Sequence, residues 1–92
     1  MSNSPVKRVV VVPNKQGMHA RPATTLIRLV KTFKSAISLK KGDKTVKLNS
    51  MLNILSLNIK GGETVSVIIE GEDETAAAEA LSDFFTNQLK DL

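Results

Sequence analysis

The sequence predicts an α+β domain in which a four-stranded, mostly antiparallel sheet carries its helices on one face. Two patterns alternate along the 92 residues. Short runs rich in Val and Ile indicate strands, and segments with apolar residues at helical spacing indicate amphipathic helices. The resulting order is β-α-β-β-α-β-α, with no repeat or low-complexity linker. A chain of this length supports one hydrophobic core, so residues 1–92 are expected to form a single domain.

The first strand and first helix are expected on either side of the segment NKQGMHARPA. Residues Val6–Val12 are rich in β-branched side chains and are followed by Pro13, which predicts a strand that ends in a loop over residues 14–17. An amphipathic pattern then starts within the quoted segment and predicts a helix. Its apolar positions are Ala23, Leu26, Ile27, Val30 and Phe33.

Two alternating runs on either side of Gly42-Asp43 predict a hairpin, because glycine at the first central position suits a turn that needs positive φ. The apolar members of the two runs are Ile37, Leu39, Val46 and Leu48. The dense apolar stretch after Asn49-Ser50 predicts a short helix, capped by one of these two residues and closed before Gly61-Gly62.

The last part of the chain predicts one more strand and a C-terminal helix. The stretch ETVSVIIEG alternates around Val67 and forms the strand. Asp73 and Glu74 open the helix, where acidic groups complement the positive end of its dipole. Its expected buried positions are Ala77, Ala80, Leu81, Phe84 and Leu89.

Composition excludes several classes of function. The formal net charge of +4 is modest, and Phe33, Phe84 and Phe85 are the only aromatic residues, so a base-stacking surface for nucleic acid is not expected. Most of the lysines are then read as a solvated face. There is no cysteine, and no apolar run is long enough to cross a membrane. We expect a soluble cytoplasmic protein that binds neither nucleic acid nor membrane.

His19 is the only histidine of the chain. One histidine without cysteine cannot supply a zinc site, so no metal is expected. Ser50 lacks the local sequence of a nucleophile elbow, so a catalytic triad is poorly supported. The position of His19 at a helix start is more informative than its residue type.

Pro22 belongs in the first turn of a helix, which places unpaired backbone N–H groups near Ala20 and Arg21, beside the imidazole. These donors, the positive end of the helix dipole and a guanidinium form an environment suited to phosphate. Gly17 allows a close approach or a left-handed turn of the preceding loop. The chemical hypothesis is a histidine that accepts a phosphoryl group and gives it away. The alternative is a histidine that merely caps the helix or lies on the surface.

Three stretches resemble HPr, the histidine-containing phosphocarrier of the bacterial phosphoenolpyruvate-dependent phosphotransferase system. GMHARPA resembles the active-site signature of that family, and NSMLNILSLNIKGGETV and GEDETAAAEAL resemble its central helix, last strand and C-terminal helix. The resemblance covers nearly the whole chain. It implies an open-faced β-sandwich, with a four-stranded antiparallel sheet and three helices on one face.

The resemblance also implies roles for individual residues. His19 corresponds to the phosphoacceptor, which is phosphorylated on Nδ1, and Arg21 to the arginine that steadies the phosphate. Pro22 would shape the helix start. The phosphoryl group would arrive from phospho-enzyme I and leave to an enzyme IIA component. Such a carrier is a transfer intermediate rather than an enzyme, needs no cofactor, and is expected to be a monomer.

Ser50 lies where many family members, chiefly from Gram-positive bacteria, carry a regulatory serine phosphorylated by a dedicated kinase. The structural alternative is a serine that only caps the short helix. Asn49 replaces the lysine common before that serine in sugar-type members, and Asn-Ser is more similar to the nitrogen-related branch. A regulatory protein of a nitrogen-type phosphorelay, acting mainly by protein binding, is therefore an alternative function, and the branch stays open.

The short helix is too apolar to be buried on every side. Met51, Leu52 and Leu55 cannot all face inward together with Ile54, so an apolar patch should stay exposed. The alternative is a small core whose edge is incompletely covered. We favour a docking surface for successive partners, with Arg28 at its rim to steer acidic groups.

Overall fold

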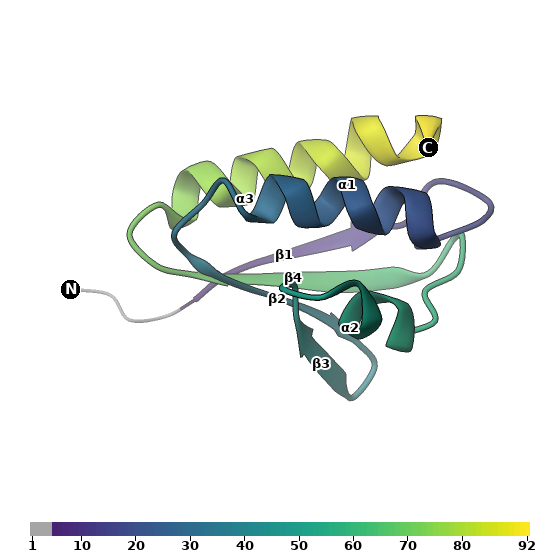
Figure 1. The fold of residues 1–92 in the computed structure, drawn as a ribbon, viewed down its shortest axis with the longest axis horizontal. Coiled ribbons are helices and arrows are strands. Elements are labelled where there is room, and N and C mark those ends of the chain that lie inside the picture. Colours follow the sequence, from purple (N-terminus) through teal and green to yellow (C-terminus); the bar gives the residue numbers. More distant parts are fainter. Residues whose placement is uncertain (1–4) are drawn as a thin grey trace.

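The computed structural model describes residues 5–92 and shows the predicted order of strands and helices (Figure 1). Its elements are β1 Val6–Val11, α1 Ala20–Val30, β2 Ala36–Lys41, β3 Lys44–Lys47, α2 Met51–Ser56, β4 Thr64–Glu70 and α3 Glu74–Asp83. A π-helical segment η1, Phe84–Gln88, and a 3₁₀ segment η2, Leu89–Asp91, continue α3 to the end of the chain.

The four strands form one sheet in the order β1-β4-β2-β3, with every neighbouring pair antiparallel. Figure 1 shows α1 and α3 side by side over one face of this sheet, while α2 lies at the end near β3. The opposite face carries no helix, so the predicted open-faced sandwich is confirmed.

The core lies between the sheet and the helices. Alternate residues of β4, namely Val65, Val67 and Ile69, are buried, because successive side chains of a strand point to opposite faces. Leu26 of α1 and Leu81 of α3 are completely buried on the helical side. The outward residues of β1 stay exposed, with Val9 at 64% and Val11 at 58%.

Three element boundaries differ from the sequence prediction by a few residues. Val12 and Leu48 were expected in strands but lie just beyond β1 and β3, although both are buried and bonded to neighbouring backbone. Helix α1 begins at Ala20, within the segment where the sequence predicted its start, but it ends at Val30, before Phe33 of the expected apolar pattern. Ser50, rather than Asn49, caps α2.

The C-terminal segment buries four of the five residues expected, namely Ala77, Leu81, Phe84 and Leu89. Ala80 is half-exposed, whereas Ala78 and Phe85 are buried. The π-helical turn that starts at Phe84 widens the helix and shifts its register, so the two adjacent phenylalanines both reach the core. Their rings pack edge to face with centroids 5.2 Å apart.

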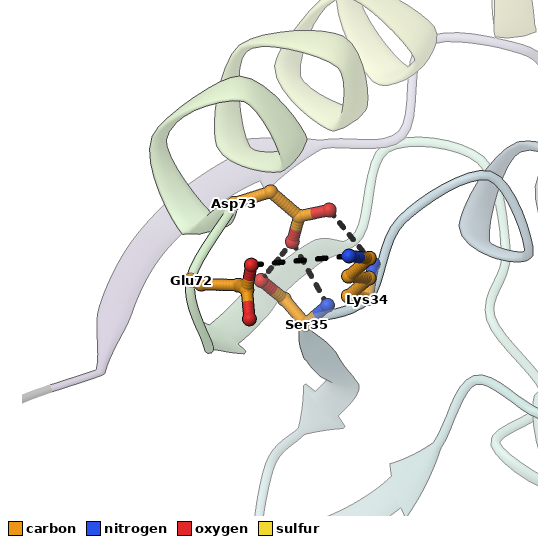
Figure 2. Close-up of polar contacts among 4 residues, drawn as sticks. All are labelled: Lys34, Ser35, Glu72 and Asp73. Atoms are coloured by element: carbon orange, nitrogen blue, oxygen red, sulfur yellow. Dashed lines mark hydrogen bonds and ion pairs between the residues drawn. The ribbon is translucent and has the colours of Figure 1, made fainter.

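Asp73 is the N-cap residue of α3 and Glu74 lies in its first turn, as expected, and Asp73 also has a second role. Its carboxylate makes no cap bond to α3 and instead accepts hydrogen bonds from the backbone N–H groups of Lys34, at 2.7 Å, and Ser35, at 2.9 Å. The Ser35 hydroxyl also donates to it (Figure 2). The Ser35 hydroxyl bond and then the Lys34 N–H bond hold the pKa of Asp73 below its ordinary value. Asp73 therefore fastens the loop after α1 to the start of α3.

Candidate functional site

The loop between β1 and α1 is held closely against the segment that precedes β4. Gly17 has φ +69°, and a Cβ built on it would lie 2.2 Å from the backbone oxygen of Ile59. The Met18 N–H donates to that same oxygen at 3.0 Å. No side chain fits at position 17, so glycine is required both for the left-handed backbone and for the close approach.

The segment that receives this loop is itself fixed by one carboxylate. Glu63 Oε1 accepts from Nζ of Lys41 at 2.9 Å and from the backbone N–H of Lys60 at 2.6 Å. The Lys41 and Lys60 hydrogen bonds lower the pKa of Glu63. Lys41 also donates to the backbone oxygen of Asn58 at 2.7 Å, where the chain takes a left-handed turn. The Ile59 oxygen is thus held in place from the sheet side.

Within the loop, the Gly17 carbonyl oxygen accepts two hydrogen bonds. One comes from Nδ2 of Asn14 at 2.9 Å and the other from the backbone N–H of His19 at 3.2 Å. Asn14 is 8% exposed, which makes it one of two buried polar residues among those described. The sequence alone indicates no role for Asn14, since a polar residue in a loop is normally exposed.

His19 is the N-cap residue of α1 and has extended backbone angles, φ −96° and ψ −171°. Its carbonyl oxygen accepts the first bond of the helix, from Ala23 at 3.1 Å. The side chain makes no cap bond, so the capping alternative for His19 is wrong. The backbone N–H groups of Ala20 and Arg21 precede that first bond and have no partner inside the helix.

The two nitrogens of the His19 ring differ in their surroundings. Nε2 is buried and has no hydrogen-bond partner among the described residues, while the residue as a whole is only half-buried. This leaves Nδ1 as the ring nitrogen open to an incoming group. Arg21 is exposed in the first turn of α1 and forms no ion pair with any other residue from 5 to 92. Pro22 follows it and is buried.

Helix α2 packs against α1 and exposes the apolar side chains that the sequence suggested. Leu52 is 79% and Leu55 38% exposed, whereas Ile54 is completely buried. Met51 is half-buried, and its sulfur accepts a hydrogen bond from the Thr24 hydroxyl of α1 at 3.4 Å. An apolar surface is therefore tied to the helix that begins at His19.

Ser50 begins α2, and its hydroxyl oxygen accepts from the backbone N–H of Asn53 at 3.4 Å. This capping bond is enough to explain a serine at this position. Arg28 lies in the last turn of α1 and is exposed.

No group of three metal-binding side chains occurs within residues 5–92, and none of the helices in that range is long and apolar enough to cross a membrane. The described residues therefore offer no candidate metal site, at His19 or elsewhere.

Comparison with known proteins identifies a family with the same sequence features. Residues 6–87 match the family described as "PTS HPr component phosphorylation site". The chain is 40% identical over 70 residues to "Phosphocarrier protein HPr" of Lysinibacillus sphaericus, across 76% of this chain and 80% of that protein. It is 37% identical over 83 residues to "HPr-like protein Crh" of Halalkalibacterium halodurans, across 90% of this chain and 99% of that protein.

Solved structures show the same fold. HPr-C-His from Thermoanaerobacter tengcongensis superimposes with a TM-score of 0.87 at 33% identity, across 91% of this chain and 94% of that one. An HPr dimer from the same organism gives a TM-score of 0.72 at 35% identity, across 87% and 92% of the two chains.

Proposed function

This chain belongs to the HPr family of phosphocarriers, and from that premise we propose that it receives a phosphoryl group on Nδ1 of His19 from phospho-enzyme I. The group then passes to an enzyme IIA component of a phosphotransferase system. The observation that carries the proposal is the half-buried His19 at the N-cap of α1, with Nε2 buried and Nδ1 left open. We further propose that this exchange takes place in the cytoplasm.

The transfer requires no cofactor and no proton from the solvent. The lone pair of Nδ1 attacks the phosphorus, the bond from phosphorus to the donor breaks, and the departing donor group keeps that electron pair. The same exchange in the other direction loads the acceptor protein. The chain is a carrier in this scheme and not a stand-alone enzyme.

The start of α1 suits a phosphate that must be held and then released. The unpaired N–H groups of Ala20 and Arg21 and the positive end of the helix dipole favour an anion next to the ring. The exposed guanidinium of Arg21 has no competing ion pair in the described residues and can turn toward the phosphate oxygens. Gly17 keeps bulk away from the loop.

The partner surface that we propose consists of Met51, Leu52 and Leu55 of α2, with Arg28 at its rim. Leu52 is the most exposed of the three apolar side chains, and the Thr24 hydroxyl bond to Met51 keeps this surface next to α1. Flexible Met and Leu side chains repack easily, which suits one surface that meets enzyme I and an enzyme IIA component in turn.

Regulation through Ser50 is part of the proposal. An HPr serine kinase/phosphatase would act on its hydroxyl, which caps α2 next to Met51. Phosphate would add a charge of about −1.5 to −2 at the start of the helix, where negative charge is tolerated. The same charge would lie beside apolar groups that must lose water on docking. Phosphorylation would therefore weaken docking rather than unfold the helix.

The second candidate is a mainly regulatory protein of a nitrogen-type phosphorelay that acts by binding. Asn49 and the similarity to an HPr-like protein favour it. His19 favours the carrier, since a protein that acts only by binding has no need of a phosphoacceptor.

We propose that the carrier works as a monomer. Charged Lys7 and Arg8 lie in the edge strand β1, and charge on an edge strand opposes pairing with a second copy. The HPr dimer of T. tengcongensis is the reason to measure this by light scattering across a range of protein concentrations.

The decisive test is incubation with phosphoenolpyruvate, Mg²⁺ and enzyme I, followed by intact-mass measurement. The wild type should gain one phosphoryl group that is lost in acid and survives base, as a phosphoramidate does. His19→Ala should gain none. Acid-labile phosphate on His19→Ala would overturn the assignment.

A further inference from the structure

Two polar atoms in the loop before α1 are buried without a hydrogen-bond partner among residues 5–92. They are Oδ1 of Asn14 and Nε2 of His19. Folded proteins rarely leave buried polar atoms unpaired, because each lost its bonds to water when the chain folded. Finding two of them in one short loop, one on the phosphoacceptor ring itself, calls for a common explanation.

Asn14 and His19 are hydrogen-bonded to the same backbone oxygen. The Gly17 carbonyl oxygen accepts from both Nδ2 of Asn14 and the N–H of His19. Because both donors meet at one oxygen, the Asn14 carboxamide lies beside the backbone from which the imidazole extends. The bond to Gly17 also fixes which end of the carboxamide carries the nitrogen, so the unpaired atom is an oxygen that only accepts.

The chemistry of the ring makes the two atoms complementary. A neutral imidazole carries one N–H, and Nδ1 attacks phosphorus only with a free lone pair, so the proton must lie on Nε2. Nε2 is then a buried donor that lacks an acceptor. Oδ1 of Asn14 is a buried acceptor that lacks a donor.

We propose that Asn14 is a positioning residue for His19, and that its Oδ1 accepts the Nε2–H bond and thereby selects the tautomer with a free lone pair on Nδ1. The inference rests on the proposed role of Nδ1 as phosphoacceptor. The bond closes by rotation of the ring or through one bridging water, and both routes select the same tautomer. Asn14 thus acts twice, since Nδ2 fixes the loop and Oδ1 fixes the proton.

This arrangement also serves the loaded carrier. Once Nδ1 holds the phosphoryl group, Nε2 is the only ring nitrogen that can carry a proton, and the proposed bond to Oδ1 of Asn14 can persist. The ring needs no turn between the two states, which keeps the attacking and departing positions of the phosphoryl group aligned.

The test is nitrogen NMR of ¹⁵N-histidine-labelled protein in alkaline solution, where the imidazole is neutral. The wild type should show the Nε2–H tautomer, with this proton protected from exchange with water. Asn14→Ala removes the acceptor and should shift the tautomer ratio toward Nδ1–H and slow phosphorylation about tenfold. Asn14→Asp keeps an acceptor oxygen while losing the donor to Gly17, so it should retain the Nε2–H tautomer. Gln16→Ala, an exposed change in the same loop, should match the wild type.

Equal tautomer ratios in Asn14→Ala and Asn14→Asp would show that Asn14 supports the loop and nothing more. If both variants unfold, the wild-type spectrum decides: a dominant Nδ1–H tautomer, or an Nε2–H that exchanges freely, overturns the inference. Failure of the carrier function gives a different result, namely a wild type that takes no phosphate from phospho-enzyme I whatever its tautomer.

Discussion

The two ends of α1 differ in whether their polar groups have hydrogen-bond partners. At the acceptor end, residues 14–21, the helix begins without a side-chain cap, and two polar side-chain atoms are buried without partners. At the stapled end, residues 34–35 and 71–73, the Asp73 carboxylate accepts three hydrogen bonds, and Lys34 and Glu72 add an exposed ion pair (Figure 2).

Under the proposed function, this difference separates a phosphate-binding end from a structural end. Unpaired donors at the start of a helix are stabilised by an arriving anion, so leaving them open prepares a place for phosphate. A carboxylate that is already fully bonded offers nothing to a ligand but fixes the loop that joins α1 to β2. Changes at the acceptor end should therefore alter phosphotransfer, and changes at the stapled end should alter stability.

A pair of glycines provides the strongest test of this separation. Gly17→Ala at the acceptor end places a Cβ 2.2 Å from the Ile59 oxygen, at a φ of +69° that alanine rarely adopts. The loop must move away from the segment before β4 and carry His19 with it. We expect the rate of phosphorylation by enzyme I to fall about 100-fold, since displacing a reacting atom by about 1 Å has an effect of that size.

The matched control is Gly71→Ala at the stapled end. Its Cβ would lie 2.6 Å from the Ser35 Cα and Oγ, at φ +155°, so the strain is comparable. Its thermal midpoint should fall. The phosphorylation rate per folded molecule should stay within about twofold of the wild type, because a substitution far from the phosphoacceptor acts independently of it. Equal loss of rate in the two variants would mean that the ends are not independent.

The sequence predicted the architecture well because its signals are local. The alternation of β4, the glycine of the hairpin turn and the apolar stripe of α1 each depend on near neighbours, and Gly42 has the expected positive φ of 59°. Phe85 escaped prediction because one π-helical turn alters the helix register, a choice made by the packed core.

The candidate site was predictable only in part. His19, Arg21 and Gly17 stand in one short motif and could be chosen from it. Asn14 could not, because its burial depends on the Gly17 carbonyl and on the distant segment that covers the loop. Asp73 likewise bonds to residues far from it in the sequence, in the loop after α1, and no motif at either position predicts the contact.

Arg21→Ala should have the next largest effect on the acceptor end. If Arg21 makes the charge-assisted bond to the phosphate that we propose, its removal should slow phosphotransfer by roughly 10- to 100-fold. The thermal midpoint should not change, because Arg21 is exposed and forms no ion pair with another described residue. Rapid-quench rates and a thermal melt measure the two quantities separately.

Lys34→Ala is the corresponding change at the stapled end. Its ion pair with Glu72 spans 3.9 Å between side chains that are both 79% exposed, and such pairs contribute little. Neither rate nor midpoint should move. A lower midpoint in Arg21→Ala than in Lys34→Ala would identify Arg21 as a structural residue instead.

Ser50→Asp tests whether the acceptor end extends to the surface of α2. The added carboxylate would lie beside the exposed Leu52, and crowding it against an apolar partner surface should weaken binding to enzyme I about tenfold, equivalent to about 1.4 kcal/mol. Isothermal titration of wild type, Ser50→Asp and the patch control Leu52→Ala measures this. Three equal affinities would remove both the docking surface and the regulatory role of Ser50.

The smallest change that we expect to detect is the acid sensitivity of the stapled end. The hydrogen bond from the Ser35 hydroxyl, followed by that from the Lys34 N–H, lowers the pKa of Asp73 in the folded protein below its unfolded value near 3.9. Its contribution to stability is therefore complete above the unfolded pKa and is lost as the pH falls through the folded pKa. Between about pH 5 and pH 3 the thermal midpoint of the wild type should fall more steeply than that of Asp73→Asn, whose side chain cannot titrate.

Asp43→Asn, in the exposed hairpin turn, controls for the loss of one negative charge and should follow the wild-type slope. At neutral pH, Asp73→Asn should accept phosphate from enzyme I at the wild-type rate per folded molecule, because the acceptor end does not depend on this carboxylate. Parallel curves of thermal midpoint against pH for wild type and Asp73→Asn would show that the bonds of Asp73 connect the two segments without stabilising the fold.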